Sequence, residues 1–308
     1  MTDNPVLRSD GDVDALSDAL IHFPLQARIY ASPRVCGTWR LNPSGHHQAG
    51  FHLISAGGCW LHQCDVSPLR LTAGDLVFVA RDRWHVFASE RILAGDDTVL
   101  DNQGDGPALE LICGSVDFPD GTGQALLAGL PDILVVPAEQ VSDRERVQSL
   151  ARLMALECAG DAAGGRVIQD RLADVLVVLV LRHLMEAGTT ASGLLAALAD
   201  PHLSRALAVI HRDYEQPLSL NSLASYAGLS RSAFARRFAA MVGDTPVNYL
   251  SSWRMHHADR WLRERRYSVS QIASRLDYET EAAFRRAFKR IRGVAPGHLR
   301  RLYSQAPD

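Results

Sequence analysis

Two segments near the end of the chain carry the same arrangement of apolar and polar positions. The repeat pairs these residues at an offset of 50: Ala233 with Ala283, Phe234 with Phe284, Arg236 with Arg286, Phe238 with Phe288, Gly243 with Gly293 and Pro246 with Pro296. In each copy the two phenylalanines are four residues apart, so they share one face of a helix. The pattern predicts two helix-turn-helix motifs.

The residues between the predicted helices agree with that pattern. Ser219 and Ser268 are suited to cap the first helix of each copy, and Ser230 and Thr280 (or Glu279) to cap the second. Gly228 stands where the first turn requires positive φ, whereas Asp277 occupies that place in the second copy. A long helix over 246–266, with Pro246 at its first position and Trp253 and Trp261 on one buried face, is expected to join the two.

Residues 27–118 alternate in short apolar runs broken by Gly, Pro, Asn and Asp, which favours a strand-rich sandwich or barrel. The predicted strands are 27–30, 37–41, 51–55, 59–64, 75–79, 85–88 and 109–113, with a loop at 91–107. Helices are predicted at 13–23, 142–157, 167–185 and 201–214, and a linker at 187–193. The apolar pair near 142–186 is expected either to form a dimer interface or to pack on its own barrel.

The charge is divided unevenly along the 308 residues. Residues 200–308 hold 18 Lys and Arg and 10 Asp and Glu, a net of +8, and because the whole chain carries −3 the remainder carries −11. A basic third beside an acidic remainder indicates a nucleic-acid-binding module joined to another domain. No apolar run has the length of a membrane helix and the first residues are polar and acidic, so we expect a cytoplasmic protein without membrane contact.

The C-terminal residues resemble the AraC/XylS family of bacterial transcription regulators. The similarity lies in 217–238, in Gly243-Asp244-Thr245-Pro246, in 268–273 and in 284–289. It implies double-stranded DNA and RNA polymerase as partners and suggests an activator, although the sequence does not distinguish activation from repression. The family's Gly-Phe before the second reading helix is Asp277-Tyr278 here.

The N-terminal turns of the second helix of each motif are expected to contact DNA. The candidate contact residues are Ser230, Arg231, Ser232, Ala235, Arg236, Glu281, Ala282, Arg285 and Arg286. Glu281, which only accepts hydrogen bonds, is expected to favour the N4 amine of cytosine.

The segment 74–85 resembles the second motif of the cupin family, with Ala80 in place of proline and Asp82 in place of glycine, and the glutamate of the first motif is missing. The resemblance implies a barrel in which His47, His52 and His85 hold Zn²⁺ or another divalent ion, with His46 and His62 as further candidates. The alternatives are a small organic effector in the barrel or histidines without a ligand role.

Five cysteines without a Cys-x-x-Cys pair argue against a disulfide framework. Cys36, two residues after Arg34 and four before Arg40, and Cys113 resemble cysteines of cupin-type regulators that respond to oxidants, which suggests redox sensing.

Together these patterns predict an α+β chain, with an N-terminal cupin-like β-barrel with flanking helices and a C-terminal all-α double helix-turn-helix domain. The expected domains are 1–190, a sensor with a helical dimerisation element at about 140–187, and 191–308, the DNA-binding domain. We expect a homodimeric regulator that is not an enzyme and that senses a small molecule, a metal or an oxidant. The alternatives are a metal-dependent cupin enzyme fused to a DNA-binding module and an architectural DNA-binding protein with a silent barrel.

Overall fold

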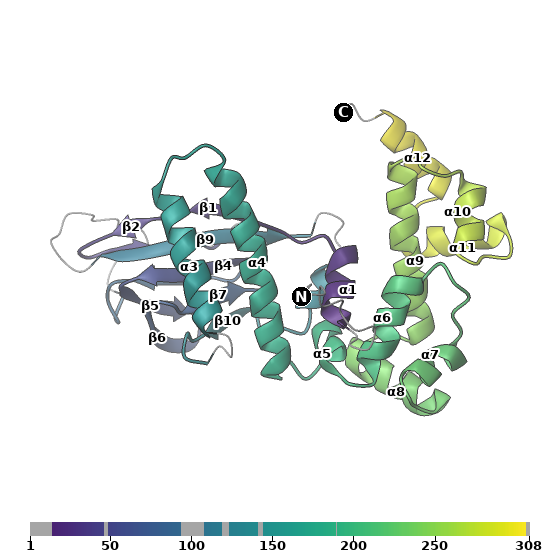
Figure 1. Ribbon diagram of the computed structural model, residues 1–308, viewed down its shortest axis with the longest axis horizontal. Coiled ribbons are helices and arrows are strands. Elements are labelled where there is room, and N and C mark those ends of the chain that lie inside the picture. Colours follow the sequence, from purple (N-terminus) through teal and green to yellow (C-terminus); the bar gives the residue numbers. More distant parts are fainter. Residues whose placement is uncertain are drawn as a thin grey trace, which may run out of the picture. The chain divides into compact units, whose positions relative to one another are not determined.

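The computed structural model describes residues 14–45, 49–93, 108–118, 123–140, 144–188 and 190–305. The chain divides into two compact units (Figure 1). One unit is Phe23–Thr190, and the other combines Met1–His22 with Ala191–Asp308. Figure 1 shows the strands in the first unit and only helices in the second.

The first unit contains two antiparallel sheets. The larger sheet has the order β1-β9-β4-β7-β10 with β2 on β9, and the smaller has the order β3-β8-β5-β6. The strands are β1 Gln26–Ala31, β2 Arg34–Val35, β3 Arg40–Leu41, β4 Ala49–Ala56, β5 Gly58–Gln63, β6 Val66–Thr72, β7 Leu76–Val79, β8 His85–Ala88, β9 Leu109–Asp117 and β10 Ile133–Val136. Among the described residues they form no closed barrel, an arrangement consistent with a cupin-like jelly roll. The strand-rich prediction is confirmed.

A buried apolar cluster fills the space between the sheets. Its members include Trp39, Ile54, Leu61, Leu71, Val77, Phe87, Leu111 and Cys113. Strands β2, β6 and β10 were not expected from the sequence. Strand β6 contains Pro68 and exposes most of its residues, as edge strands do. Strand β10 is a short apolar run that follows the expected loop in the chain. Most of that loop, 91–107, lies outside the described residues.

Glycine allows three strands of the larger sheet to approach closely. A Cβ on Gly114 would lie 2.3 Å from the ring of Phe51 on β4 and 2.9 Å from the carbonyl oxygen of Arg28 on β1. Gly50 is similar, because its Cβ would lie 2.7 Å from the carbonyl oxygen of Gly114. Both glycines line the cavity described below.

Helices α2 Gln124–Leu127, α3 Arg144–Ala159 and α4 Gly165–Glu186 complete the first unit. Helices α3 and α4 pack against each other, α4 packs on β1 and α3 on β4 (Figure 1). Asp174 on α4 accepts a hydrogen bond of 2.8 Å from the N–H of Ala27. The inner face of the pair is buried, but its outer face leaves apolar side chains exposed: Leu153, Leu156, Val167, Ile168 and Val175.

The second unit consists of helices only in its described part. They are α1 Ala15–His22, α5 Leu194–Ala199, α6 Leu203–Asp213, α7 Leu220–Tyr226, α8 Arg231–Val242, α9 Pro246–Arg263, α10 Val269–Arg275, α11 Glu281–Arg292 and α12 Pro296–Gln305. Helix α1 packs on α6, although the sequence placed it with the first domain. Ala15, Leu16 and Ala19 are its buried residues, and they supply the apolar contact.

A column of aromatic and histidine rings runs along α9 and includes His211 and Tyr214 from the end of α6. The rings of Tyr214 and His257 are stacked, with centroids 3.9 Å apart and planes at 9°. His211 lies against Trp253 at 4.3 Å and donates to or accepts from the hydroxyl of Tyr249 at 2.8 Å. Trp253 and Trp261 are both buried, as the sequence predicted, so α9 is the core of this unit.

Candidate DNA interface and sensor site

The first helix-turn-helix consists of α7 and α8. Ser219 and Ser222 form a capping box that begins α7, and the hydroxyl of Ser230 accepts from the N–H of Ala233 to begin α8. Gly228 lies between the helices with φ of 65°, in the left-handed region that favours glycine. Local residue chemistry therefore sets both helix starts and the turn, as the sequence indicated.

Helix α8 has one buried and one exposed face. Phe234 and Phe238 are fully buried, whereas Arg231, Ser232 and Arg236 are exposed and Ala235 is half-buried. Exposed arginines at the start of a second helix are the groups that reach phosphates and base edges in a major groove.

The second motif, α10 and α11, repeats this construction. Ser268 and Gln271 form a capping box, and Thr280 accepts from the N–H of Ala283 at 3.1 Å. Thr280, not Glu279, is therefore the cap. Asp277 has φ of 61°, so it adopts the conformation that Gly228 adopts in the first motif. Aspartate tolerates this region better than most residues do.

Helix α11 buries Phe284 and Phe288 and presents Ala282, Arg285 and Arg286 to solvent. Glu281 is half-buried and forms an ion pair with Arg285, whose Nη2 lies 2.6 Å from Oε1 of the glutamate. The carboxylate of Glu281 thus already has a partner on its own helix.

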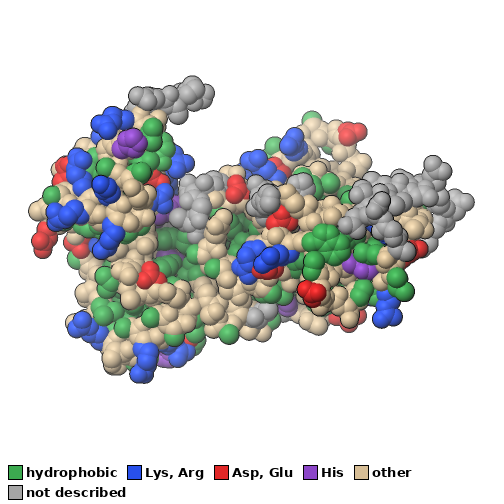
Figure 2. Space-filling model, turned by 180° about the vertical axis from the view of Figure 1, so that it is seen from behind, with side chains coloured by type: hydrophobic (Ala, Val, Ile, Leu, Met, Phe, Trp, Pro, Cys, Tyr) green, Lys and Arg blue, Asp and Glu red, His purple; other side chains and the backbone are tan. Residues whose placement is uncertain are grey.

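Some arginines of the unit serve the fold instead. Arg237 bonds to buried Asp200, and Arg292 bonds to buried Asp259. Although burial acts in the opposite direction, the guanidinium of Arg237 and the N–H groups of Leu203 and His202 lower the pKa of Asp200. This role of Arg292 has no local signal in the sequence, because its partner Asp259 lies 33 residues away along the chain. Figure 2 shows further Lys and Arg side chains spread over the surface of this unit, on the left.

In the first unit, the rings of His52 on β4 and His85 on β8 meet. Their Nε2 atoms are 3.2 Å apart, and Nδ1 of His85 lies 2.7 Å from the carbonyl oxygen of Arg83. A carbonyl only accepts, so Nδ1 of His85 carries the hydrogen and its Nε2 accepts from Nε2–H of His52. Burial lowers the pKa of His85 and so favours the neutral ring. The hydrogen bond to the Arg83 carbonyl has a smaller, opposing effect on this pKa.

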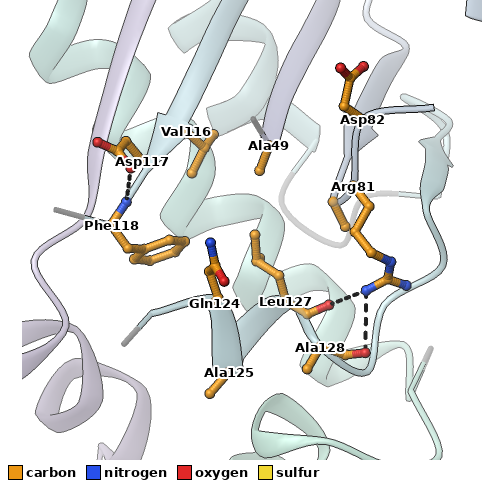
Figure 3. A pocket seen from close by; sticks show the side chains of 11 residues that line it. Ala49, Arg81, Asp82, Val116, Asp117, Phe118, Gln124, Ala125, Leu127 and Ala128 are labelled. Atoms are coloured by element: carbon orange, nitrogen blue, oxygen red, sulfur yellow. Dashed lines mark hydrogen bonds between the residues drawn. The ribbon is translucent and has the colours of Figure 1, made fainter. Parts of the chain in front are cut away.

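The two histidines line a cavity of about 420 Å³ between the sheets. Its lining comprises Tyr30, Pro43, Ala49, Gly50, His52, Val79, Asp82, His85, Gly114 and Ser115. A neighbouring hollow of about 610 Å³ shares Ala49 and Asp82 with it. Figure 3 shows that in this second hollow the guanidinium of Arg81 contacts the carbonyls of Leu127 and Ala128, each at 3.4 Å. Arg81 is therefore used to hold the chain near α2.

The structure does not place the other predicted metal ligands beside His52 and His85. His46 and His47 lie outside the described residues, and Nε2 of His62 is 3.0 Å from the carbonyl oxygen of Glu90. Within the described ranges no group of three or more His, Cys, Asp or Glu side chains is arranged to hold a metal. Among the described histidines, His52 and His85 have the nitrogen spacing of two zinc ligands, because two nitrogens bound to tetrahedral Zn²⁺ lie about 3.3 Å apart.

The two cysteines of the redox hypothesis have different surroundings. Cys113, opposite His52 in the β4–β9 register, is 1% exposed, and burial raises the pKa of its thiol to about 12. Cys36 is half-buried. All five cysteines lie in described ranges and none forms a disulfide. Cys113 is a weak nucleophile in this conformation, because the thiolate is the reactive form.

Comparisons with known proteins agree with this arrangement. Residues 14–186 match the family described as Cupin, and residues 223–302 match the family described as Helix-turn-helix domain. A putative AraC-like transcription regulator of Streptomyces lividans is 32% identical over 94% of this chain and 98% of its own length. The transcriptional regulator AlkR of Acinetobacter baylyi is 28% identical over 94% of this chain and 99% of its own length.

Two further matches extend the comparison. The RCS-specific transcriptional activator RclR of Escherichia coli is 24% identical over 95% of this chain and 99% of its own length. The solved DNA-binding domain of AdpA in complex with a target DNA is 29% identical and covers 35% of this chain and 99% of that one, with a TM-score of 0.33. None of the helices in the described ranges has both the length and the apolar character needed to span a bilayer. The relatives are named as transcription regulators, and the chain belongs to the AraC family of DNA-binding transcription regulators that carry a cupin domain.

Proposed function

We propose that this cytoplasmic protein binds a specific operator through both reading helices and changes that binding when its cupin-like domain receives a signal. The observation that carries the DNA part is the repeat itself. Both α8 and α11 begin at a capped turn, bury two phenylalanines and expose arginines in their first two turns. Two such helices suit successive major-groove faces about one helical turn apart.

The candidate contact residues divide by their chemistry. Arg231, Arg236, Arg285 and Arg286 supply charge to phosphates or paired donors to guanine, and Ser230, Ser232, Ala235 and Ala282 allow close approach of the helix start. The test is selection of duplexes from a random pool by the full chain, followed by footprinting of the selected sequence. Two protected half-sites about 10 base pairs apart support the proposal, and one half-site or none contradicts it.

For the signal, we propose that the cavity holding His52 and His85 is the sensor site. Its two imidazoles have the spacing of two ligands of a Zn²⁺ site, and the Nδ1–H of His85 is oriented by a backbone carbonyl as in many metal-binding histidines. By family resemblance His47 would supply a third ligand. Bound zinc would act here as a structural ion that links β4 to β8.

The test of the metal proposal is thermal unfolding of chelator-treated protein with and without zinc. We expect zinc to raise the melting temperature of the wild type but not of His52→Ala or His85→Ala. His62→Ala, which removes a buried histidine outside the pair, is the control and should keep the zinc response. If the wild type ignores zinc, an organic effector in the cavity becomes the better proposal.

The oxidant alternative rests on the resemblance of Cys36 and Cys113 to cysteines of cupin-type regulators that respond to oxidants. It requires that the buried Cys113 thiol become accessible, because its raised pKa makes it unreactive in this conformation. Thiol counting before and after mild oxidant decides it, and loss of two thiols would favour it over zinc.

We also propose that the α3–α4 pair joins two copies of the chain. Its outer face leaves Leu156 71% and Val167 64% exposed, more than a solvated helix face usually carries. Leu156→Glu should shift the sedimentation coefficient from dimer to monomer, whereas a monomeric wild type contradicts the proposal. RNA polymerase is expected as a partner of the DNA-bound protein by family resemblance.

A further inference from the structure

The loop between α6 and α7 receives an arginine from the helix that joins the two motifs. Arg254 on α9 donates from Nε to the carbonyl oxygen of Tyr214 at 2.8 Å and from Nη2 to that of Gln216 at 2.7 Å. The side chain is buried, so these charge-assisted bonds are shielded from solvent. The loop of the first motif's scaffold is thereby attached to the middle of α9.

A second arginine reaches the same loop from the second motif. Arg275, the last residue of α10, places Nη2 2.7 Å from Oε2 of Glu215. Its guanidinium also lies over the rings of Trp261 and Tyr267, at 5.5 and 4.8 Å from their centroids. Stacking on two rings restricts the guanidinium to the orientation that meets Glu215.

The turn of the second motif completes the contact. Oδ2 of Asp277 lies 3.5 Å from Nη2 of Arg254, the same nitrogen that bonds to Gln216. Asp277 has positive φ, where glycine is the unstrained residue. A glycine at this position has no carboxylate to offer Arg254, so the aspartate adds an attachment that a glycine turn lacks.

We infer that this set of contacts, which we name the clasp (loop 214–216 with Arg254, Arg275 and Asp277), fixes the second motif relative to the first and so sets the half-site spacing that the protein accepts. Helix α9 joins the motifs and packs against α8, α10 and α11, and Arg292 of α11 bonds to Asp259 of α9. The clasp adds a direct attachment of loop 214–216 to α10 and the α10–α11 turn, which does not depend on those contacts. Because half-site spacing follows from the geometry of the two reading helices, a rigid pair accepts one spacing only.

The clasp residues act by positioning the second motif, without contacting DNA. The inference rests on the proposal that both α8 and α11 contact the duplex. Glu215→Gln removes the ion pair with Arg275, and Asp277→Gly removes the carboxylate while keeping a residue that favours the turn. Glu264→Gln is the matched control. It also removes an ion pair, but the partner, Arg260, is four residues away in the chain, so this pair does not connect the two motifs.

The experiment uses the duplex selected by the wild type, resynthesised with one base pair added or removed between the half-sites. The wild type and Glu264→Gln should lose affinity of the order of tenfold or more on either change, as for a mismatched base pair. The double variant Glu215→Gln with Asp277→Gly should lose only about threefold or less. The inference is overturned if the double variant loses as much affinity as the wild type when the spacing changes. It is also overturned if the wild type binds all three spacings equally well.

A second measurement separates failure of the clasp from failure of the proposed function. Amide hydrogen exchange in α10 and α11 of the free protein should be several-fold faster in the double variant than in the wild type, with α8 unchanged. Unchanged exchange overturns the clasp even if no duplex is selected. Failure of the wild type to select two half-sites, with faster exchange in the variant, overturns the two-helix proposal and leaves the clasp as a contact of the fold.

Discussion

Arg285 and Glu281 are bonded to each other across one turn of α11: Nε of Arg285 donates to Oε1 of Glu281 at 2.7 Å, and Nη2 lies 2.6 Å from the same oxygen. Both residues belong to the first turns that are expected to meet DNA. The pair restricts the guanidinium before DNA binds, so less side-chain entropy is lost on binding. It also means that Glu281 reaches a cytosine only by sharing its carboxylate with Arg285.

Glu281→Ala should therefore broaden the base preference at one position of the second half-site. Removing the carboxylate releases Arg285 and removes a negative charge from a surface that faces phosphates, so affinity for random duplex should rise while discrimination falls by about 1 kcal/mol or more. Duplex selection with the variant is the measurement. An unchanged preference would show that neither residue of the pair reads a base.

Arg236→Ala and Arg286→Ala should each weaken DNA binding and lower its salt dependence. If each arginine neutralises one phosphate, the slope of log affinity against log salt should fall by about 0.9 per substitution. Both side chains are exposed, so loss of folding is not expected. Arg182→Ala, an exposed arginine on α4 of the other unit, is the control, and a variant of α8 or α11 that behaves like it argues against contact by that helix.

Asp200→Asn should lower the stability of the second unit in a pH-dependent way. The folded pKa of Asp200 lies below its ordinary value, so its stabilising contribution is present above that value and is lost as the pH falls through the folded pKa. At neutral pH the substitution should cost roughly 1 kcal/mol or less, the range for a partly exposed ion pair, because asparagine keeps an Oδ1 that accepts from the N–H groups of His202 and Leu203 but loses the charge that meets Arg237.

Urea unfolding at pH 7 and at pH 3 checks this prediction. The difference in unfolding free energy between the wild type and Asp200→Asn should be smaller at pH 3. An equal difference at both pH values would mean that the charge of Asp200 does not contribute and that its hydrogen bonds alone matter.

Gly114→Ala should destabilise the cupin-like unit by about 1–3 kcal/mol, the range for overpacking, because the added Cβ would lie 2.3 Å from the ring of Phe51. Gly160→Ala is the matched control, since its Cβ would meet nothing closer than 3.6 Å. Thermal unfolding measures both. If Gly114→Ala melts like Gly160→Ala, strands β1, β9 and β4 separate more easily than their contacts indicate.

Local signals were readable from the sequence. Ser219, Ser230 and Ser268 act as caps and Gly228 takes positive φ, because each depends on residues within a few positions along the chain. Partners at long range were not readable. No residue near Arg237 or Arg292 in the sequence indicates that Asp200 and Asp259 are their partners. Some arginines of a basic helix are therefore paired within the fold, although the sequence suggests that they are available to DNA.

In the cupin-like unit, too, local signals were readable from the sequence and long-range contacts were not. The motif that ends at His85 located one histidine, but its contact with His52 depends on how β4 and β8 meet across two sheets. Strand β6 was missed because Pro68 and its exposed side chains resemble a loop, and only its pairing with β5 makes it a strand.

The ring column around α9 has an optical consequence. Trp253 and Trp261 stand in it beside His211 and His257, while the other three of the five tryptophans, Trp39, Trp60 and Trp84, belong to the unit with the sheets. Intrinsic fluorescence of the wild type therefore reports on both units, and a variant that retains only Trp253 and Trp261 would follow the melting of the helical unit alone without any added dye.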